Sequence, residues 1–154
     1  MGPYPVPSHL DYYGEGEDRF YFLTLGKNEL AVCLGDAETP LFYACVDPVR
    51  GRLVYANARS EPALLARKHS RRVVHLENDG TITMQPGDVM VAFMGGIPER
   101  VVLDAIRENP DARAGPLVSR ILESARGTVV AVRFIADEEP ALAEESAELT
   151  LAVA

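Results

Sequence analysis

The densest group of reactive side chains in this sequence is a basic cluster near its middle. The segment ARKHSRR carries Arg67, Lys68, Arg71 and Arg72 within six positions. Guanidinium and ammonium groups recognise phosphate and carboxylate groups, but they are also common in loops that face water. The cluster has no interleaved aromatic residues, and the net charge of −8 opposes broad binding of nucleic acid. We expect a solvated loop here or, as the alternative, a patch for an anion or an acidic partner.

The thiols and imidazoles of the chain form no pattern that is typical of catalysis or metal binding. Cys33 and Cys45 lie in the apolar runs AVCLG and FYACV, where a free cysteine behaves as a small hydrophobic residue. A disulfide is not expected in a reducing cytoplasm. The chain has no CxxC or HExxH motif and only three scattered histidines, so a zinc site is not supported.

The composition is that of one globular domain. The chain has 154 residues, 47% of them apolar and 25% charged, which suffices for one core and is too short for two ordinary domains. No apolar run approaches the roughly 20 residues of a membrane-spanning helix. The N-terminus lacks the basic start and apolar stretch of a signal peptide. We therefore expect a cytoplasmic protein that binds neither membranes nor nucleic acid.

Proline content and charge divide the chain into three segments. Residues 1–10 are rich in proline, which disfavours regular elements there. Residues 136–154 contain six acidic residues and no basic one. We expect one domain over residues 10–135, preceded by the Pro-rich segment and followed by an acidic tail.

Two β-hairpins are predicted in the first half of the chain. The apolar runs Asp18–Gly26 and Glu29–Gly35 are separated by two residues, which is a hairpin signal. The runs Leu41–Asp47 and Arg52–Ala58 flank the sequence PVRG, whose proline and glycine suit a tight turn.

The second half combines strands with helices. RVVHLEN and TITMQ predict weaker strands around a turn at Asp79-Gly80, and the unbroken apolar run Asp88–Met94 is typical of a central strand buried on both faces. Helical periodicity follows twice, after Pro98 and after Pro116, before a last strand at Thr128–Ile135. These elements predict an α+β domain, a β-sandwich with helices packed outside.

Four motifs follow one another along the chain: LDYYG at Leu10–Gly14, LAVCLGDAE at Leu30–Glu38, DPVRGRLVYANA within Tyr43–Leu65, and QPGDVMVAFMGGIPE at Gln85–Glu99. Together they resemble the SpoIIE/RsbU branch of the metal-dependent (PPM, type 2C) protein serine/threonine phosphatases. LDYYG at Leu10–Gly14 is similar to the family's GGDYYD, and LAVCLGDAE at Leu30–Glu38 is similar to its strand and GD turn. Tyr43–Leu65, which contains DPVRGRLVYANA, is similar to the family's YANA hairpin and is the most specific match. Gln85–Glu99 is similar to the segment that ends in YTDG. The resemblance covers residues 10–134.

The resemblance implies a site for two Mn²⁺ or Mg²⁺ ions held by aspartates. Asp11 takes the place of the aspartate in GGDYYD, while Asp36 and Gly35 take the places of the metal-bridging aspartate and the glycine before it. Gly95 and Ala125 stand where two further metal aspartates belong. Judged as a residue alone, an aspartate after a glycine at a strand end is equally ordinary turn chemistry.

The resemblance also implies a reduced fold, because the two long central helices of the family are missing. The chain passes almost directly from Asp36 to Leu41, where the family inserts those helices. A sheet face that they would cover is then left open, and an exposed apolar face requires a partner. We expect a homodimer or a tight protein partner on that face.

Three functions are compatible with the sequence. The first is a degenerate phosphatase domain that binds proteins in a partner-switching circuit, with no cofactor and with a STAS-type anti-anti-sigma factor or a kinase as its partner. The second is an active Mn²⁺- or Mg²⁺-dependent protein phosphatase in which Glu38, Asp88 or Glu99 replaces a lost ligand. The third is an unrelated β-rich interaction domain. The loss of two aspartates from one site favours the first.

Overall fold

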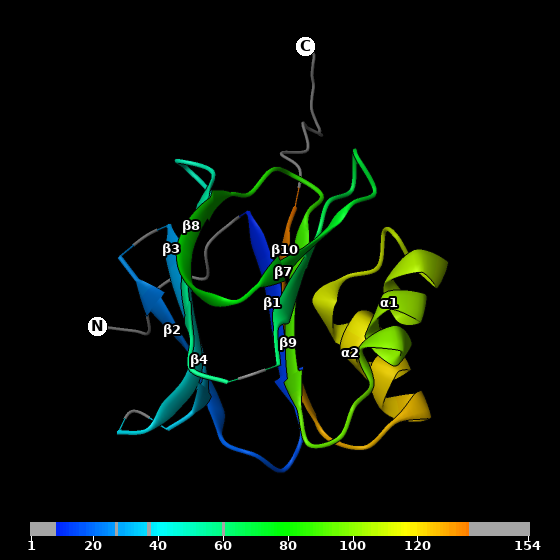
Figure 1. The fold of residues 1–154 in the computed structure, drawn as a ribbon. Coiled ribbons are helices and arrows are strands. Elements are labelled where there is room, and N and C mark those ends of the chain that lie inside the picture. Colours follow the sequence, from blue (N-terminus) through cyan, green and yellow to red (C-terminus); the bar gives the residue numbers. More distant parts are fainter. Residues whose placement is uncertain (1–8, 27, 37, 60, 136–154) are drawn as a thin grey trace, which may run out of the picture.

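Two antiparallel sheets of five strands each pack face to face, and two helices lie against the outer side of one of them (Figure 1). The computed structural model describes residues 9–135 except residues 27, 37 and 60. Sheet A has the strand order β1 (Leu10–Glu15), β10 (Thr128–Phe134), β9 (Val89–Met94), β6 (Ala63–Ala66), β7 (Val73–Leu76). Sheet B has the order β2 (Phe20–Leu25), β3 (Glu29–Gly35), β4 (Pro40–Asp47), β5 (Arg52–Asn57), β8 (Asn78–Thr83). The helices are α1 (Glu99–Glu108) and α2 (Ala114–Ser124).

The main core lies between the two sheets, because alternate residues of each strand point inward. From sheet B, Leu34 of β3 and Phe42 of β4 face each other in register and are fully buried. From sheet A, Met90 and Val130 belong to the same buried cluster. Tyr12 of β1 and Phe22 of β2 close this core with ring centroids 4.8 Å apart.

A second core lies between sheet A and the helices. The apolar face of α2, with Leu117, Val118 and Ile121, packs against Val129 and Ala131 of β10. Strands β9 and β10 are therefore buried on both faces. The prediction of a central strand at Asp88–Met94 is confirmed.

The predicted fold class is confirmed as well. The structure is an α+β sandwich with helices outside, and both predicted hairpins form, as β2–β3 and β4–β5. Figure 1 shows α1 and α2 on the sheet A side and no described helix on the sheet B side. No described helix is long and apolar enough to cross a membrane.

Two local predictions need correction. Asp79-Gly80 does not form a turn, because it lies within β8; the chain changes sheet just before, at Asn78, whose φ of 61° is left-handed. Helix α2 begins at Ala114, two residues before Pro116, which the first helical turn tolerates because its N–H groups need no partner within the helix. The predicted acidic tail and most of the Pro-rich segment lie outside the described residues.

The outer face of sheet B presents two apolar rows to the surface. Cross-strand register places Leu23, Ala31, Cys45 and Val54 in one row and Tyr21, Cys33, Tyr43 and Ala56 in the next. Leu23 is 50% exposed and Val54 43% exposed. We call these eight residues the open face. Its two cysteines are free, Cys33 buried and Cys45 partly buried.

Candidate functional site

Two aspartates meet at one end of the sandwich. Asp18 precedes β2, and the hydroxyl of Thr128, at the start of β10, donates to Asp18 Oδ2 over 2.8 Å and accepts from the Asp18 N–H over 2.9 Å. Asp36 follows β3, whose last residue, Gly35, donates its N–H to the carbonyl of Arg19 over 2.7 Å. Asp18 and Asp36 line a common pocket of about 440 Å³. Asp18 therefore lies with the predicted site residues Asp36 and Gly35, although the sequence analysis did not predict it as a site residue.

Asp36 also makes the turn contact expected of an aspartate at a strand end. Its Oδ1 accepts from the N–H of Thr39 over 2.9 Å and from the Thr39 hydroxyl over 2.8 Å. These hydrogen bonds, together with the nearby charge of Arg19, lower the pKa of Asp36 below its usual value. The carboxylate is therefore ionised and partly committed to its own loop.

Asp11 does not lie with this pair. It stands near the other end of β1, opposite Arg133 of β10, whereas β10 begins beside Asp18 at Thr128. Its Oδ2 accepts from the N–H of Ala114 over 2.6 Å, at the start of α2. Asp11 and Asp36 were expected to serve one metal site. Their positions do not allow this, because most of the six-residue strand β1 lies between Asp11 and the end of the sandwich where Asp18 and Asp36 lie. Asp11 caps a helix instead.

The two positions that lack the family's aspartates do lie at the same end as Asp18. Gly95 follows β9, and a Cβ added there would lie 3.5 Å from Asp18 Oδ2 but only 3.1 Å from the Cα of Gly127. Its φ is +92°, a conformation that side chains rarely adopt. Ala125 ends α2, two residues before Gly127. We call the region formed by Asp18, Asp36, Gly95 and residues 125–127 the aspartate end.

A buried positive charge also lies near this end. Arg59 follows the YANA hairpin, and its Nη1 donates to the carbonyl of Phe93, two residues before Gly95. Its Nη2 is buried and has no hydrogen-bond partner. Burial lowers the pKa of Arg59, yet a guanidinium stays charged at neutral pH. Arg126, in the loop before β10, adds an exposed charge of the same sign.

The residues of the aspartate end do not fit a pair of divalent ions. Such ions need several oxygen ligands each, and paired-metal sites rely on several carboxylates. Only two aspartates gather here, and each already accepts hydrogen bonds from a threonine. Among the described residues, no group of three or more His, Cys, Asp or Glu side chains is arranged to hold a metal ion. The backbone at Gly95 disfavours a third carboxylate, because its φ of +92° is one that side chains rarely adopt and a Cβ there would lie only 3.1 Å from the Cα of Gly127.

The substitute ligands considered from the sequence do not gather with the pair. Asp88 is fully buried near the opposite end of β9, where Arg67 Nη1 donates to its Oδ2 over 2.8 Å. Glu99 lies at the start of α1 and pairs with His75 over 3.0 Å. Glu38 is near Asp36 but exposed on the turn. The altered ligand set is therefore not formed by these three residues together.

The basic cluster lies away from the aspartate end, in the loop between β6 and β7. Arg67, Lys68, Arg71 and Arg72 all line a second pocket of about 300 Å³ against α1. Only part of the cluster is solvated loop: Arg67 is bound to Asp88, and Lys68 Nζ pairs with Asp111 over 2.7 Å.

Comparison with solved structures identifies the fold. The phosphatase domain of SpoIIE from Bacillus subtilis, solved with a fragment of its regulatory domain, matches with a TM-score of 0.59 and 12% identity, over 82% of this chain and 62% of that one. The RsbU and RsbW domains of Rv1364c from Mycobacterium tuberculosis match with a TM-score of 0.63 and 14% identity, over 85% of this chain and 61% of that one. RsbX in complex with magnesium matches with a TM-score of 0.63 and 8% identity, over 83% of this chain and 96% of that one.

These matches show that the chain has the fold of the SpoIIE/RsbU-type PP2C phosphatase domains. The resemblance read from the motifs is thereby confirmed for the fold. The chain spans only about three fifths of the first two of these structures, 62% and 61%. No family model matches the sequence, and no curated protein does.

A signal for Asp18 was present in the sequence. The hairpin of Asp18–Gly26 and Glu29–Gly35 was predicted, and in an antiparallel hairpin the residue before the first strand lies beside the residue after the second. Asp18 and Asp36 flank this hairpin on its open end. The symmetry of the hairpin predicts their proximity, whereas the motif match at Leu10–Gly14 drew attention to Asp11.

Proposed function

We propose that this chain is a protein-binding regulatory domain that keeps the fold of a metal-dependent phosphatase without its hydrolytic activity. The observation that carries this proposal is the composition of the aspartate end. Two aspartates that already accept hydrogen bonds lie with Gly95, whose backbone disfavours a side chain, and the buried guanidinium of Arg59 binds the carbonyl of Phe93, two residues before that glycine. This arrangement is chemically opposed to holding two dications.

Metal titration and phosphatase assays test the loss of hydrolysis. The protein is titrated with Mn²⁺ and with Mg²⁺ by calorimetry, and hydrolysis of p-nitrophenyl phosphate is assayed at saturating metal. The variants are Asp18→Asn and Asp36→Ala, with Asp104→Asn on the exposed side of α1 as the control. We expect no saturable metal binding and no turnover above that of the variants. Metal-dependent turnover that Asp18→Asn abolishes and Asp104→Asn keeps would establish an active phosphatase instead.

A partner from a partner-switching circuit is the second part of the proposal. Its support is the setting of the structural neighbours, which include RsbU joined to an RsbW domain in Rv1364c and a component of the bacterial stressosome. A STAS-type anti-anti-sigma factor or a kinase is the class of partner that this setting favours. Titration with a purified STAS protein, phosphorylated and unphosphorylated, tests this class: binding without release of phosphate supports the proposal, and absence of binding by both forms contradicts it.

A second copy of the chain is the occupant we propose for the open face. An outer sheet face in contact with water ordinarily carries polar side chains. The exposed residues on this face are instead large and apolar or aromatic: Tyr21, Leu23, Tyr43 and Val54. The next row along the sheet contains Glu29 of β3, Asp47 of β4 and Arg52 of β5. Opposite charges on one face complement a copy of that face turned by a two-fold axis.

A further inference from the structure

The pocket beside the basic cluster has a floor made by a single cross-strand row of sheet A. Register places Arg133 of β10, Val89 of β9, Ala66 of β6 and Val73 of β7 side by side on the face that carries the helices. Leu103, Ile106 and Arg107 of α1 form the opposite wall, and the β6–β7 loop closes a third side. The pocket of about 300 Å³ is at the lower limit of sites that hold small organic molecules.

Arg133 is the charged residue at the base of this pocket. It is only 6% exposed, and its Nη1 donates to the carbonyl of Gly87 over 2.8 Å. Its Nε and Nη2 are buried and have no hydrogen-bond partner. The N–H groups on Nε and Nη2 form one edge of the guanidinium, and this edge binds two oxygens of a phosphate or carboxylate at once. A buried donor pair of this kind is costly unless an acceptor fills it.

The acidic residues near Arg133 are already engaged elsewhere. Asp11, its neighbour across the sheet, accepts from the N–H of Ala114. Asp88 is bound to Arg67, and Asp111 is bound to Lys68. These three carboxylates raise the pKa of Arg133, although burial lowers it more and the net shift is downward. Within residues 9–135 as the structure describes them, no group therefore accepts a hydrogen bond from the free edge.

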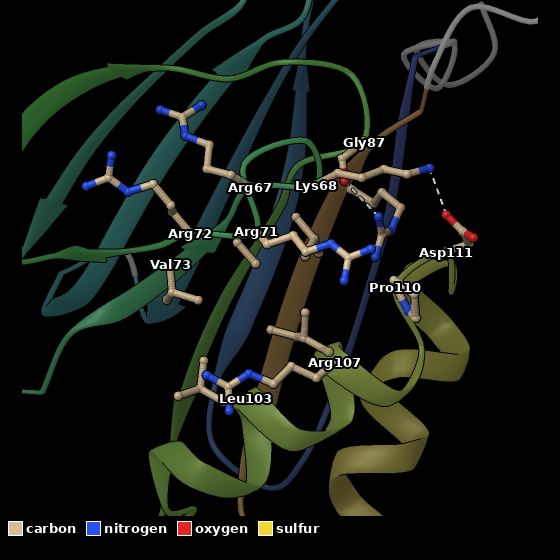
Figure 2. A pocket seen from close by; sticks show the side chains of 14 residues that line it. Arg67, Lys68, Arg71, Arg72, Val73, Gly87, Leu103, Arg107, Pro110 and Asp111 are labelled. Carbon is tan, nitrogen blue, oxygen red and sulfur yellow. Dashed lines mark hydrogen bonds and ion pairs between the residues drawn. The ribbon is translucent and has the colours of Figure 1, made fainter.

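Further positive charge surrounds the same space. Arg71 and Arg107 also line the pocket, and neither forms an ion pair with another residue in the part of the chain that the structure describes. Figure 2 shows Arg71 reaching from the loop into the space beside α1, whereas Arg72 points away from the helix. The Lys68–Asp111 ion pair bridges the loop to the connection between the helices (Figure 2). Among the described residues, Arg71, Arg107 and Arg133 therefore have no counter-ion of their own. Figure 2 shows that the Arg107 side chain runs along α1 toward Leu103, so Arg71 is the second charge that reaches into the pocket.

From this geometry we propose that the pocket binds a small organic phosphate. The phosphoryl oxygens accept from the free edge of Arg133, and Arg71 balances the second negative charge. The remainder of the ligand packs on the apolar wall formed by Val73, Val89, Leu103 and Ile106. The site lies at the opposite end of β10 from Thr128 and Asp18, so it is separate from the aspartate end and from the open face. The proposal does not depend on the proposed function.

Calorimetry with phenylphosphonate tests the site, because this probe joins a phosphoryl group to an apolar ring through a bond that phosphatases do not cleave. The titration is carried out in EDTA with the wild-type chain, with inorganic phosphate as the second probe. We expect saturable binding of phenylphosphonate and weaker binding of inorganic phosphate, which lacks the apolar part. Arg133→Lys keeps the charge but removes the two-pronged edge, and we expect affinity to fall by about tenfold or more.

A matched variant controls for net charge. Arg120→Gln removes a positive charge from α2, where Arg120 pairs with Glu108 over 2.8 Å on the surface, and should leave affinity within about twofold. Arg71→Gln is the second test variant, and its affinity decides the question if Arg133→Lys does not fold. Absence of phenylphosphonate binding, or unchanged affinity in the test variants, would overturn the site. Equal affinity for inorganic phosphate and phenylphosphonate would overturn the assignment of an organic ligand.

Discussion

At the scale of one residue, the backbone at Gly95 disfavours any side chain in the position that corresponds to an aspartate of the phosphatase motif. Its neighbour Gly96 has nearly the same backbone, with φ of +96° against +92°, but a Cβ on Gly96 would meet nothing within 4 Å. Substitution by alanine should therefore cost about 1 kcal/mol at Gly96, from the left-handed conformation alone. At Gly95 we expect a larger loss of unfolding free energy, about 2 kcal/mol, because the Cβ would also lie only 3.1 Å from the Cα of Gly127.

Urea denaturation of the two alanine variants measures this difference. Equal losses of unfolding free energy in the Gly95 and Gly96 variants would show that the backbone at Gly127 can move away from a Cβ at Gly95. In that case a carboxylate at Gly95 would become sterically possible, and Gly95→Asp should be tested for Mn²⁺ binding.

Asp47 is a second single residue with a measurable effect, because it makes the unfolding free energy of the protein depend on pH. Burial raises the pKa of Asp47, but hydrogen bonds from the backbone and guanidinium of Arg50 outweigh this effect and hold the pKa below the usual 3.8. A lowered pKa in the folded state stabilises the protein above the pKa of the unfolded state, and this stabilisation is lost as the pH falls through the folded pKa. Asp47→Asn should cost about 1 to 2 kcal/mol at pH 7.

The measurement is the unfolding free energy of both proteins between pH 7 and pH 2. The difference between wild type and Asp47→Asn should shrink below pH 3.8, the usual value for an aspartate. A difference that stays constant over this range would mean that Asp47 titrates alike in the folded and unfolded chain.

At the scale of elements, Asp11 joins β1 to α2. Helix α2 has no capping side chain of its own at Arg113, and the carboxylate of Asp11 accepts from the N–H of Ala114 instead. The negative charge also lies at the positive end of the helix. Asp11→Ala should therefore lower the unfolding free energy by about 1 kcal/mol.

Thermal and chemical denaturation check this role, with Asp104→Ala as the control. Asp104 is exposed on α1 and should change stability by less than about 0.5 kcal/mol. A neutral effect of Asp11→Ala would contradict the capping role.

Elements were predictable where the sequence carries its own periodicity. The hairpins β2–β3 and β4–β5 and the buried strand β9 follow from alternation, tight turns and a continuous apolar run. Strand β6 is four residues long and fully buried, so EPALLARK shows no alternation. Strand β8 contains Asp79-Gly80, a pair typical of turns, because long-range pairing with β5 overrides local preference.

At the scale of the whole molecule, the site was harder to predict than the fold. Asp36 and Gly35 were predicted as site residues from their motif, whereas Asp18 is placed beside them by its contact with Thr128, 110 positions away in the sequence. The anion pocket depends on Arg133, which in the sequence is one charge inside an apolar strand. Only the structure shows that Nε and Nη2 of Arg133 have no hydrogen-bond partner, because Arg133 lies beside Val89 and the nearby carboxylates bind other groups. Such features arise from tertiary contacts that no local pattern encodes.

The open face leads to a prediction about the size of the particle in solution. If a second copy covers this face, the protein at tens of micromolar should have twice the mass of one 16.8 kDa chain by light scattering. Leu23 and Val54 lie in one row of the face, 50% and 43% exposed. Changing both to lysine places charges within the contact, where each copy would have to bury them, so the double variant should be monomeric.

Val49→Lys is the matched control, because Val49 is 66% exposed in the turn after β4, off the open face, and should leave the dimer intact. Circular dichroism shows whether the variants remain folded. A wild-type chain that stays monomeric at these concentrations contradicts the second copy as occupant. Since no described helix or strand covers Leu23 and Val54, we would then expect the proposed STAS or kinase partner to bind there, and the double variant should abolish that binding.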